Sequence, residues 1–353
     1  MVKILKNIRP YGGELTDVTV KDGRILSLAK TDAEGEDCGG AYLFPGLIEI
    51  HSHGCMGDDT MDGTDAVRRM LVYQFEHGIT TYYPTTMTAP IERIAEIVNQ
   101  PLCSVEGGAN HLGYHMEGPF FCERYKGGQN GDFLSDPDLD GFSKLQNVSL
   151  VSVAPELRGA MEFIRDCKST VCIGHTAANF AIADAAFKAG ALCITHTCNA
   201  MPPFHHRDSS VIGAGIMNDA YAQVIGDGMH ISEPMVIALY RIFGRRRMIL
   251  ISDSMSATGL CDGEYELGGQ RAIVKGGLAR LENGTICGST TNLFDCVRRV
   301  ISFGIPPLDA FAMASETPAA LLGLNKGRLE VGYDADFILT DENYSLLRTM
   351  ILK

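Results

Sequence analysis

The chain has 353 residues, of which 45% are hydrophobic and 21% charged, a composition typical of a folded globular protein and not of a disordered one. Its formal net charge of −13 disfavours nucleic acid and anionic membranes as partners, because both repel an acidic surface. The length allows one large domain, or a large domain with a small companion.

The eleven cysteines are scattered singly and form no CxxC pair, and several lie within apolar runs such as TVCIGH and ALCITH. This pattern indicates reduced, buried thiols and not disulfides. The first residues, MVKILKNIRPYGGE, contain no apolar core of signal-peptide length, and no segment reaches the roughly 20 apolar residues of a membrane span. We therefore expect a cytoplasmic protein.

Both ends of the chain consist of short strand-like segments joined by turns. The first part contains VKILKN, LTDVTVKDG and RILSLAK, with a hairpin signal at Lys21-Asp22-Gly23. The last part contains GRLEVGYDADFILTDEN and LLRTMILK. Neither end is large enough to bury a core alone, so we expect residues 1–44 and 326–353 to form one small β-sandwich domain together.

Eight strand-like runs lie between these ends, and most of them are followed by a helix-like stretch. Segments such as TDAVRRMLVYQFEHG and NFAIADAAFKAG have the apolar spacing of helices and end at glycine. The eight runs are LIEIHSHG (47–54), ITTYYPTT (79–86), HLGYHMEG (111–118), VSLVSVAP (148–155), STVCIGHT (169–176), LCITHTCN (192–199), YAQVIGDG (221–228) and RMILISDS (247–254).

Eight alternating β and α units over about 250 residues are typical of the α/β class and of the (β/α)8 TIM barrel in particular. A doubly wound open sheet is the alternative that the pattern leaves open. We expect the barrel to occupy residues 45–325 and to carry a β-rich insertion near 262–285, after the eighth strand.

In most of these runs, a histidine, glutamate or aspartate follows the apolar body, at the carboxyl end of the strand. Barrel enzymes build their active sites at that end, so these side chains converge although they are far apart in the sequence. The first run ends at His51-Ser52-His53. Residues two apart share one face of a strand, so both imidazoles can reach one ion.

The third, fifth and sixth runs supply a candidate metal site. His115 and Glu117 share one face of the third run, and His175 and His196 end two consecutive runs. Glu117 with the imidazoles of His175 and His196 gives three ligands and an open position for water, as in catalytic zinc sites. The pattern also allows purely structural roles: an ion pair or helix cap for Glu117, and core positions for His115 or for His175 and His196.

Asp253 ends the eighth run, at the expected barrel mouth. There it can accept a proton from the attacking water and return it to a leaving nitrogen. The alternative for Asp253 is a structural cap on the following turn.

A weaker signal for phosphate recognition comes from the segment 199–207. Arg207 can pair with a phosphate, and backbone N–H groups near Asn199 and Ala200 can support it. The segment Asp227-Gly228-Met229-His230 adds a further histidine. An arginine among histidines in a loop is often only part of the solvated surface.

Several segments occur together in the order found in one enzyme family. Through them the chain resembles, from about Phe44 to Asp336, the N-acetylglucosamine-6-phosphate deacetylases of the amidohydrolase superfamily. Each segment alone is common, but the combination is specific. The segments are PGLIEIHSHG, HMEGPF, GHT, THTCNAMPPFHHR, DGMH, SDSMSATGL, DGEYELGG, LENGTICGST and ASETPAALLG.

The resemblance implies a metal-dependent hydrolase that converts N-acetylglucosamine 6-phosphate to glucosamine 6-phosphate and acetate. Zinc is the metal we expect, although iron, cobalt and manganese accept the same ligands. The principal metal ligands would be Glu117, His175 and His196. His51 and His53 match a pair that creates a second metal position, so one or two ions are expected per subunit.

The resemblance also assigns the residues that handle the substrate. Asp253 matches the catalytic acid and base. In this family the arginine can come from the partner subunit, so we expect a homodimer whose active site is completed across the interface. The substrate-contacting positions would be Asn199, Ala200, Arg207 and His230.

Three positions depart from the family pattern. Gln129 stands where a substrate-contacting histidine is common, Asp208-Ser209-Ser210 replaces Glu-Pro-Gly, and Ser254 replaces an alanine. None of these changes removes a metal ligand, but they leave open a related substrate such as N-acetylgalactosamine 6-phosphate.

A non-catalytic phosphosugar-binding protein is the alternative from another class. Cyclic-amide hydrolases are disfavoured, because no strand end offers the bridging lysine that they often use.

Overall fold

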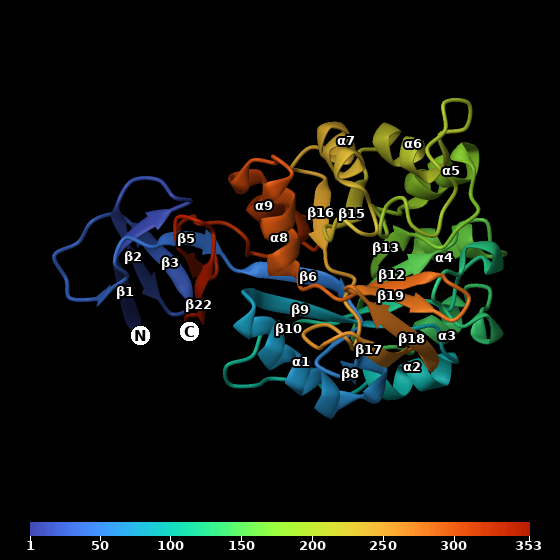
Figure 1. Cartoon of the computed structure of the whole chain (residues 1–353), viewed down its shortest axis with the longest axis horizontal. Coiled ribbons are helices and arrows are strands. Elements are labelled where there is room, and N and C mark those ends of the chain that lie inside the picture. Colours follow the sequence, from blue (N-terminus) through green and yellow to red (C-terminus); the bar gives the residue numbers. More distant parts are fainter.

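Eight parallel strands follow one another in chain order around a barrel in the computed structural model, which describes residues 1–353 (Figure 1). They coincide with the eight runs found in the sequence, and the predicted TIM barrel is confirmed. The strands are β6 (Leu47–Ser52), β9 (Ile79–Thr86), β11 (Tyr114–Glu117), β12 (Val148–Val153), β13 (Thr170–Ile173), β14 (Cys193–Ile194), β15 (Tyr221–Ile225) and β16 (Met248–Ile251).

The barrel interior is filled by apolar side chains, as expected for strands that are buried on both faces. One cluster contains Ile48 and Ile50 of β6, Leu150 of β12 and Ile249 of β16, and it extends to Leu321 of α10. The last and first strands form no regular ladder; instead, the N–H of Asp253 donates to the carbonyl of His51 at 2.9 Å.

Helices cover the outside of the barrel, and their apolar faces share a second, larger cluster with the outward side chains of the strands. Two of them match the predicted helical segments. The second of these, α5, is capped by the Asn179 side chain, which accepts from the N–H of Ile182, and ends at Gly190. The helices are α1 (Thr64–Glu76), α2 (Ile91–Val98), α3 (Leu139–Phe142), α4 (Ala160–Asp166), α5 (Phe180–Ala189), α6 (Ser210–Met217), α7 (Glu233–Phe243), α8 (Leu293–Ser302), α9 (Pro307–Met313) and α10 (Glu316–Leu321).

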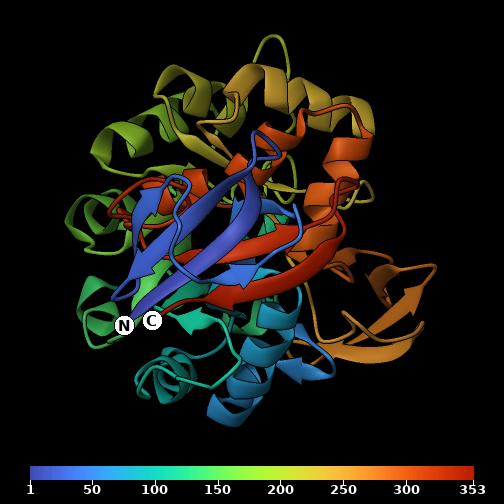
Figure 2. The ribbon, with the colours of Figure 1, turned by 90° about the vertical axis from the view of Figure 1, so that its left-hand side faces the viewer.

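The two ends of the chain form a separate small domain, and the termini lie side by side on it (Figure 2). The hairpin predicted at Lys21-Asp22-Gly23 is present, with Asp22 and Gly23 both at positive φ. Strands from the N-terminal and C-terminal segments share one apolar cluster of their own. The strands are β1 (Val2–Pro10), β2 (Thr16–Lys21), β3 (Arg24–Leu28), β4 (Glu36–Asp37), β5 (Tyr42–Pro45), β21 (Asp336–Thr340) and β22 (Leu346–Ile351).

A four-stranded antiparallel sheet follows the eighth barrel strand, in the region where the sequence indicates a β-rich insertion. Its last strand runs to Ser289, which accepts and donates hydrogen bonds at the carboxyl end of β16. The insertion is therefore anchored beside Asp253. Its strands are β17 (Gly263–Leu267), β18 (Gln270–Lys275), β19 (Leu278–Leu281) and β20 (Ile286–Ser289), and three further short strands are β7 (Gly54–Cys55), β8 (Asp58–Asp59) and β10 (Asn110–His111).

All eleven cysteines are free thiols. None of the helices combines the length and the hydropathy that crossing a membrane requires.

Candidate active site

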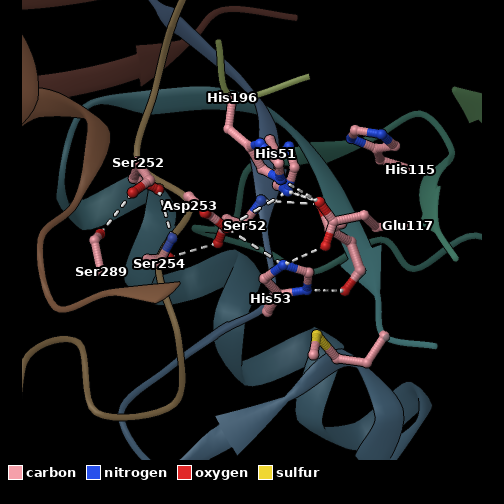
Figure 3. A network of polar contacts seen from close by, with 12 residues as sticks. His51, Ser52, His53, His115, Glu117, His196, Ser252, Asp253, Ser254 and Ser289 are labelled. Atoms are coloured by element: carbon pink, nitrogen blue, oxygen red, sulfur yellow. Dashed lines mark hydrogen bonds and ion pairs between the residues drawn. The ribbon is translucent and has the colours of Figure 1, made fainter. Parts of the chain in front are cut away.

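Polar side chains from five strand ends meet at the carboxyl end of the barrel. Figure 3 shows those that follow β6, β11, β14 and β16. They form two buried groups, and within each group the potential ligand atoms lie within 4.8 Å of one another. The first group consists of Glu117, His175 and His196, and the second of His51, His53 and Asp253.

Glu117 lies between the two groups and contacts histidines of both. Its Oε1 is 3.1 Å from Nε2 of His51 and 3.1 Å from Nε2 of His196. Its Oε2 is 3.2 Å from Nε2 of His53. The carboxylate is thus placed to be shared by two cations.

The second ring nitrogen of three of these histidines faces an oxygen acceptor. Nδ1 of His51 is 2.9 Å from the side-chain oxygen of Gln223, and Nδ1 of His53 is 3.2 Å from the carbonyl of Thr85. Nδ1 of His175 is 2.9 Å from a backbone carbonyl, that of residue 125. Such oxygens only accept, so each neutral ring carries its proton on Nδ1 and directs the Nε2 lone pair to the centre.

The donor set fits divalent cations. Burial alone would raise the pKa of Glu117, but its electrostatic interactions with the imidazoles of His51 and His175 outweigh burial and hold that pKa well below its ordinary value. Nε2 of His196 and Nε2 of His175 face each other at 2.9 Å, and Nε2 of His51 makes no hydrogen bond although it is buried. Lone pairs this close repel unless a cation lies among them, and imidazole with carboxylate is a preferred zinc ligand set.

His115 is adjacent to this centre but both of its nitrogens are occupied. Nδ1 is 2.9 Å from the carbonyl of Ile50, and Nε2 is 2.9 Å from the hydroxyl of Ser152. Its ring packs against that of His51, with centroids 4.6 Å apart. His115 therefore packs against a ring of the centre and offers no free nitrogen to an ion.

Asp253 is held from both sides at the end of β16. Its carbonyl accepts from the N–H of Ser289 at 2.7 Å, opposite the bond from its own N–H to His51. Its Oδ1 is 3.3 Å from Nε2 of His53. Burial alone would raise the pKa of Asp253, but His51 and His53 outweigh burial and lower the pKa to about 2. Asp253 is therefore a carboxylate that can accept a proton.

Three of these strand ends have an unusual backbone conformation. His175, His196 and Asp253 have φ values of 47°, 25° and 49°, in the left-handed region that non-glycine residues rarely adopt. Each such residue costs about 1–3 kcal/mol, and this strain concentrates at functional sites. All three side chains belong to the two buried groups of potential ligands.

A cavity of about 160 Å³ opens above the centre. Asn199, Ala200, His230 and Gln129, which the sequence assigns to the substrate, all line it, and no lysine or arginine does. His230 receives support from Asp227, whose Oδ2 is 2.6 Å from its Nδ1. Burial alone would lower the pKa of His230, but the bond to Asp227 outweighs it and raises that pKa.

Gln129 lies in the cavity wall with both ends of its amide engaged. Its Nε2 donates to Oε2 of Glu117 at 2.5 Å, and its Oε1 accepts from the N–H of Thr88 at 2.8 Å. The residue is thus placed beside the substrate cavity, but its hydrogen bonds hold Glu117.

Arg207 is not brought to the site of its own chain. It is exposed in the loop between β14 and α6, and it does not line the cavity. This loop projects away from the barrel (Figure 1).

Sequence reasoning missed two supporting residues, Gln223 and Asp227. A glutamine inside the buried strand YAQVI is a signal for Gln223, because a buried amide needs partners. Asp227 precedes His230 by three residues, a spacing at which a carboxylate can reach the ring. Neither signal reveals which group the residue holds.

The chain is similar to known amidohydrolases over nearly its whole length. A model of the amidohydrolase family matches residues 42–352. The N-acetylglucosamine-6-phosphate deacetylase of Vibrio furnissii is 35% identical to this chain, and the alignment covers 95% of this chain and 89% of that protein. The N-acetylgalactosamine-6-phosphate deacetylase of Escherichia coli O157:H7 is 32% identical, with 91% of this chain and 89% of that protein covered.

The whole fold is similar to a solved structure as well. This is a mutant N-acetyl-D-glucosamine-6-phosphate deacetylase from Mycobacterium smegmatis in complex with N-acetyl-D-glucosamine-6-phosphate. The TM-score is 0.89 and the sequence identity 27%, with 99% of this chain and 97% of that chain covered. The similarity therefore includes the small domain and the insertion as well as the barrel.

Proposed function

Because this chain belongs to the amidohydrolase family, and within it to the N-acetylglucosamine-6-phosphate deacetylases, we propose that it hydrolyses the acetamide of N-acetylglucosamine 6-phosphate. The products are glucosamine 6-phosphate and acetate. The observation that supports this activity is the meeting of two metal-ligand groups, one of which includes Asp253, beside one cavity.

The metal site is proposed to hold zinc. Glu117, His175 and His196 would hold the first ion, and His51 and His53, which also contact Glu117, would hold a second one. A divalent ion there supplies positive charge that lowers the pKa of a coordinated water and polarises a carbonyl oxygen. Because both histidines of the second position are present and oriented, we propose two ions per subunit.

Asp253 is the proposed acid and base of the reaction. Its carboxylate takes the proton of the attacking water and then gives it to the amide nitrogen, so that the C–N bond breaks with an amine as the leaving group. His230, held by Asp227, is placed to donate from Nε2 to the oxygen that gains negative charge. Asn199 and the backbone of Ala200, which also line the cavity, would contact the sugar.

The phosphate requires a cation that the cavity of one chain lacks. We propose that Arg207 of a second copy supplies it in a homodimer, since its loop projects from the barrel and is exposed. The eleven free thiols fit a reducing compartment, so the cytoplasm is the proposed location.

N-acetylgalactosamine 6-phosphate is a second candidate substrate. It is favoured by Gln129, which replaces a common histidine in the cavity wall, and by the similarity to the Escherichia coli enzyme. The two sugars differ only in the configuration at one hydroxyl group, so the contacts of the cavity wall decide between them.

Acetate release from three substrates tests the proposal. The zinc-loaded protein is incubated with N-acetylglucosamine 6-phosphate, with N-acetylgalactosamine 6-phosphate and with unphosphorylated N-acetylglucosamine. Preference for the first supports the proposed activity, and preference for the second supports the alternative. Binding of a sugar phosphate without acetate release would identify a non-catalytic phosphosugar-binding protein, and equal turnover of the unphosphorylated sugar would exclude a phosphate contact.

A further inference from the structure

Strand β6 is irregular at its carboxyl end, next to His51 and His53. Its pairing with β9 shifts register between Glu49 and Ser52. Ile48 and Ile50 both belong to the barrel interior, so strict alternation would point His51 and His53 outward. The irregularity reverses this alternation, as a bulge does when it re-aims a side chain. It is therefore what brings both imidazoles to the metal centre.

Glu49 is the side chain that satisfies the backbone at this irregularity. It is completely buried, and no lysine, arginine or histidine forms an ion pair with it. One carboxylate oxygen accepts from the N–H of His51 at 3.0 Å, and the other accepts from the N–H of Ser252 at 3.0 Å. The carboxylate therefore joins the first and last barrel strands, which lack a regular ladder between them.

The two amides that Glu49 holds are adjacent to functional side chains. One belongs to His51 itself, and the other belongs to the residue that precedes Asp253. The N–H of Asp253 in turn donates to the carbonyl of His51. A displacement of Glu49 would thus move a metal ligand and the proposed acid and base together.

We propose that Glu49 is a positioning residue that fixes the bulge of β6 and thereby sets His51, His53 and Asp253 in register with Glu117. It contacts neither ion nor substrate and acts only through the backbone. A carboxylate suits this task because both of its oxygens accept, whereas an amide presents an N–H group to one of the two backbone donors. The inference deepens the proposed function and rests on it for the kinetic measurement, but not for the measurement of metal binding.

Glu49→Gln tests the proposal with two independent measurements. Metal-free protein is titrated with Zn²⁺ alone, and we expect the second ion to bind about 10- to 100-fold more weakly while the ion at Glu117, His175 and His196 keeps its affinity. With both ions supplied, we expect kcat to fall by a similar factor and KM to change by less than about threefold. Glu49→Asp keeps both oxygens on a shorter side chain, so it should show the same pattern more weakly, and it replaces the first variant if that one does not fold.

Asp336→Asn is the matched control. Asp336 is another buried carboxylate, but it lies in the small domain and pairs with Lys326. This variant should leave both zinc affinities and kcat unchanged. Wild-type binding of the second ion in the Glu49 variants, or an equal loss of both ions, would overturn the proposal. A selective loss of the second ion in a protein that hydrolyses none of the sugars would support the role of Glu49 and reject the proposed function.

Discussion

At the scale of single residues, the centre depends on the groups that orient its histidines. Gln223 and two backbone carbonyls fix the proton of three rings on Nδ1, so that Nε2 is available without rearrangement. Because the rotamers and tautomers are set before an ion arrives, little ordering remains to be done on binding. Asp227 likewise orients the ring of His230 through its contact with Nδ1.

Replacing Asp253 by asparagine should separate hydrolysis from binding of the first metal ion, the one at Glu117, His175 and His196. The amide keeps the shape of the side chain but cannot accept the proton, so we expect kcat to fall by about 100- to 10,000-fold. The ion at Glu117, His175 and His196 should remain, because Asp253 is not part of that group. Metal analysis and steady-state kinetics on the same preparation check both statements. Turnover near the wild-type level, or a protein without metal, would remove Asp253 from the proposed role.

The sequence predicts which residues gather at the centre better than it predicts what each one contacts. Strand-end histidines and carboxylates are visible as a pattern, because parallel strands bring their ends together. The partner of His51, by contrast, is Gln223, and a contact between strands so far apart in the chain leaves no local signal. Ser254, a departure from the family pattern, has a structural explanation: its hydroxyl lies 2.6 Å from that of Ser52 and donates to the carbonyl of Gly54.

At the scale of elements, the small domain is tied together by a buried carboxylate. Asp17 of β2 is fully buried and accepts from the N–H of Thr31, the N–H of Asn7 and the ammonium of Lys30. The bond from Thr31 is the largest of the effects that lower its pKa, to about 2 from an ordinary value of 3.8. The carboxylate thus links the loop after β3 to the first two strands.

This pKa makes the contribution of Asp17 to stability depend on pH. Because the folded-state pKa is depressed, the contribution is complete above pH 3.8 and is lost as the pH falls toward 2. Asp17→Asn should therefore lower the melting temperature at pH 6, and the difference from the wild type should shrink between pH 4 and pH 2. Thermal melts of both proteins across this range measure the difference directly. A difference that is the same at every pH would mean that the charge of Asp17 does not contribute.

The order and type of the elements follow from periodicity, but their irregularities do not. Eight apolar runs and the intervening helical segments predict the barrel, because strands buried on both faces have a distinctive composition. The bulge of β6 is not predicted: PGLIEIHSHG also fits a regular strand, in which His51 would share a face with Glu49. The bulge depends on hydrogen bonds to the eighth strand, about 200 residues later in the chain, which local patterns do not encode. The predicted domain boundaries, with the small domain formed by residues 1–44 and 326–353, stay a prediction.

At the scale of the whole molecule, the negative charge of the protein opposes the binding of a phosphorylated substrate. The chain has a net charge of −13, its cavity has no lysine or arginine, and its proposed substrate is an anion. Phosphate binding under these conditions requires a cation brought in by another element. In the proposed homodimer a second chain places the exposed loop that carries Arg207 over the cavity, and dimerisation would then be part of the active site and not only a source of stability.

Mixing two inactive variants tests whether the site is shared between subunits. Asp253→Asn lacks the acid and base, and Arg207→Ala lacks the proposed phosphate contact. In a mixed dimer one site combines an intact Asp253 with the Arg207 of the other chain. Unfolding and refolding the two variants together at equal amounts should therefore restore about a quarter of the wild-type activity, since half of the dimers are mixed and each has one complete site.

Asp253→Asn mixed with Glu117→Gln is the control, because both residues belong to the same chain's site and no complete site can form. Recovery in the first mixture alone would establish a shared site. No recovery in either mixture would mean that Arg207 does not act across the interface, and an Arg207→Ala variant that is active by itself would place Arg207 outside the site.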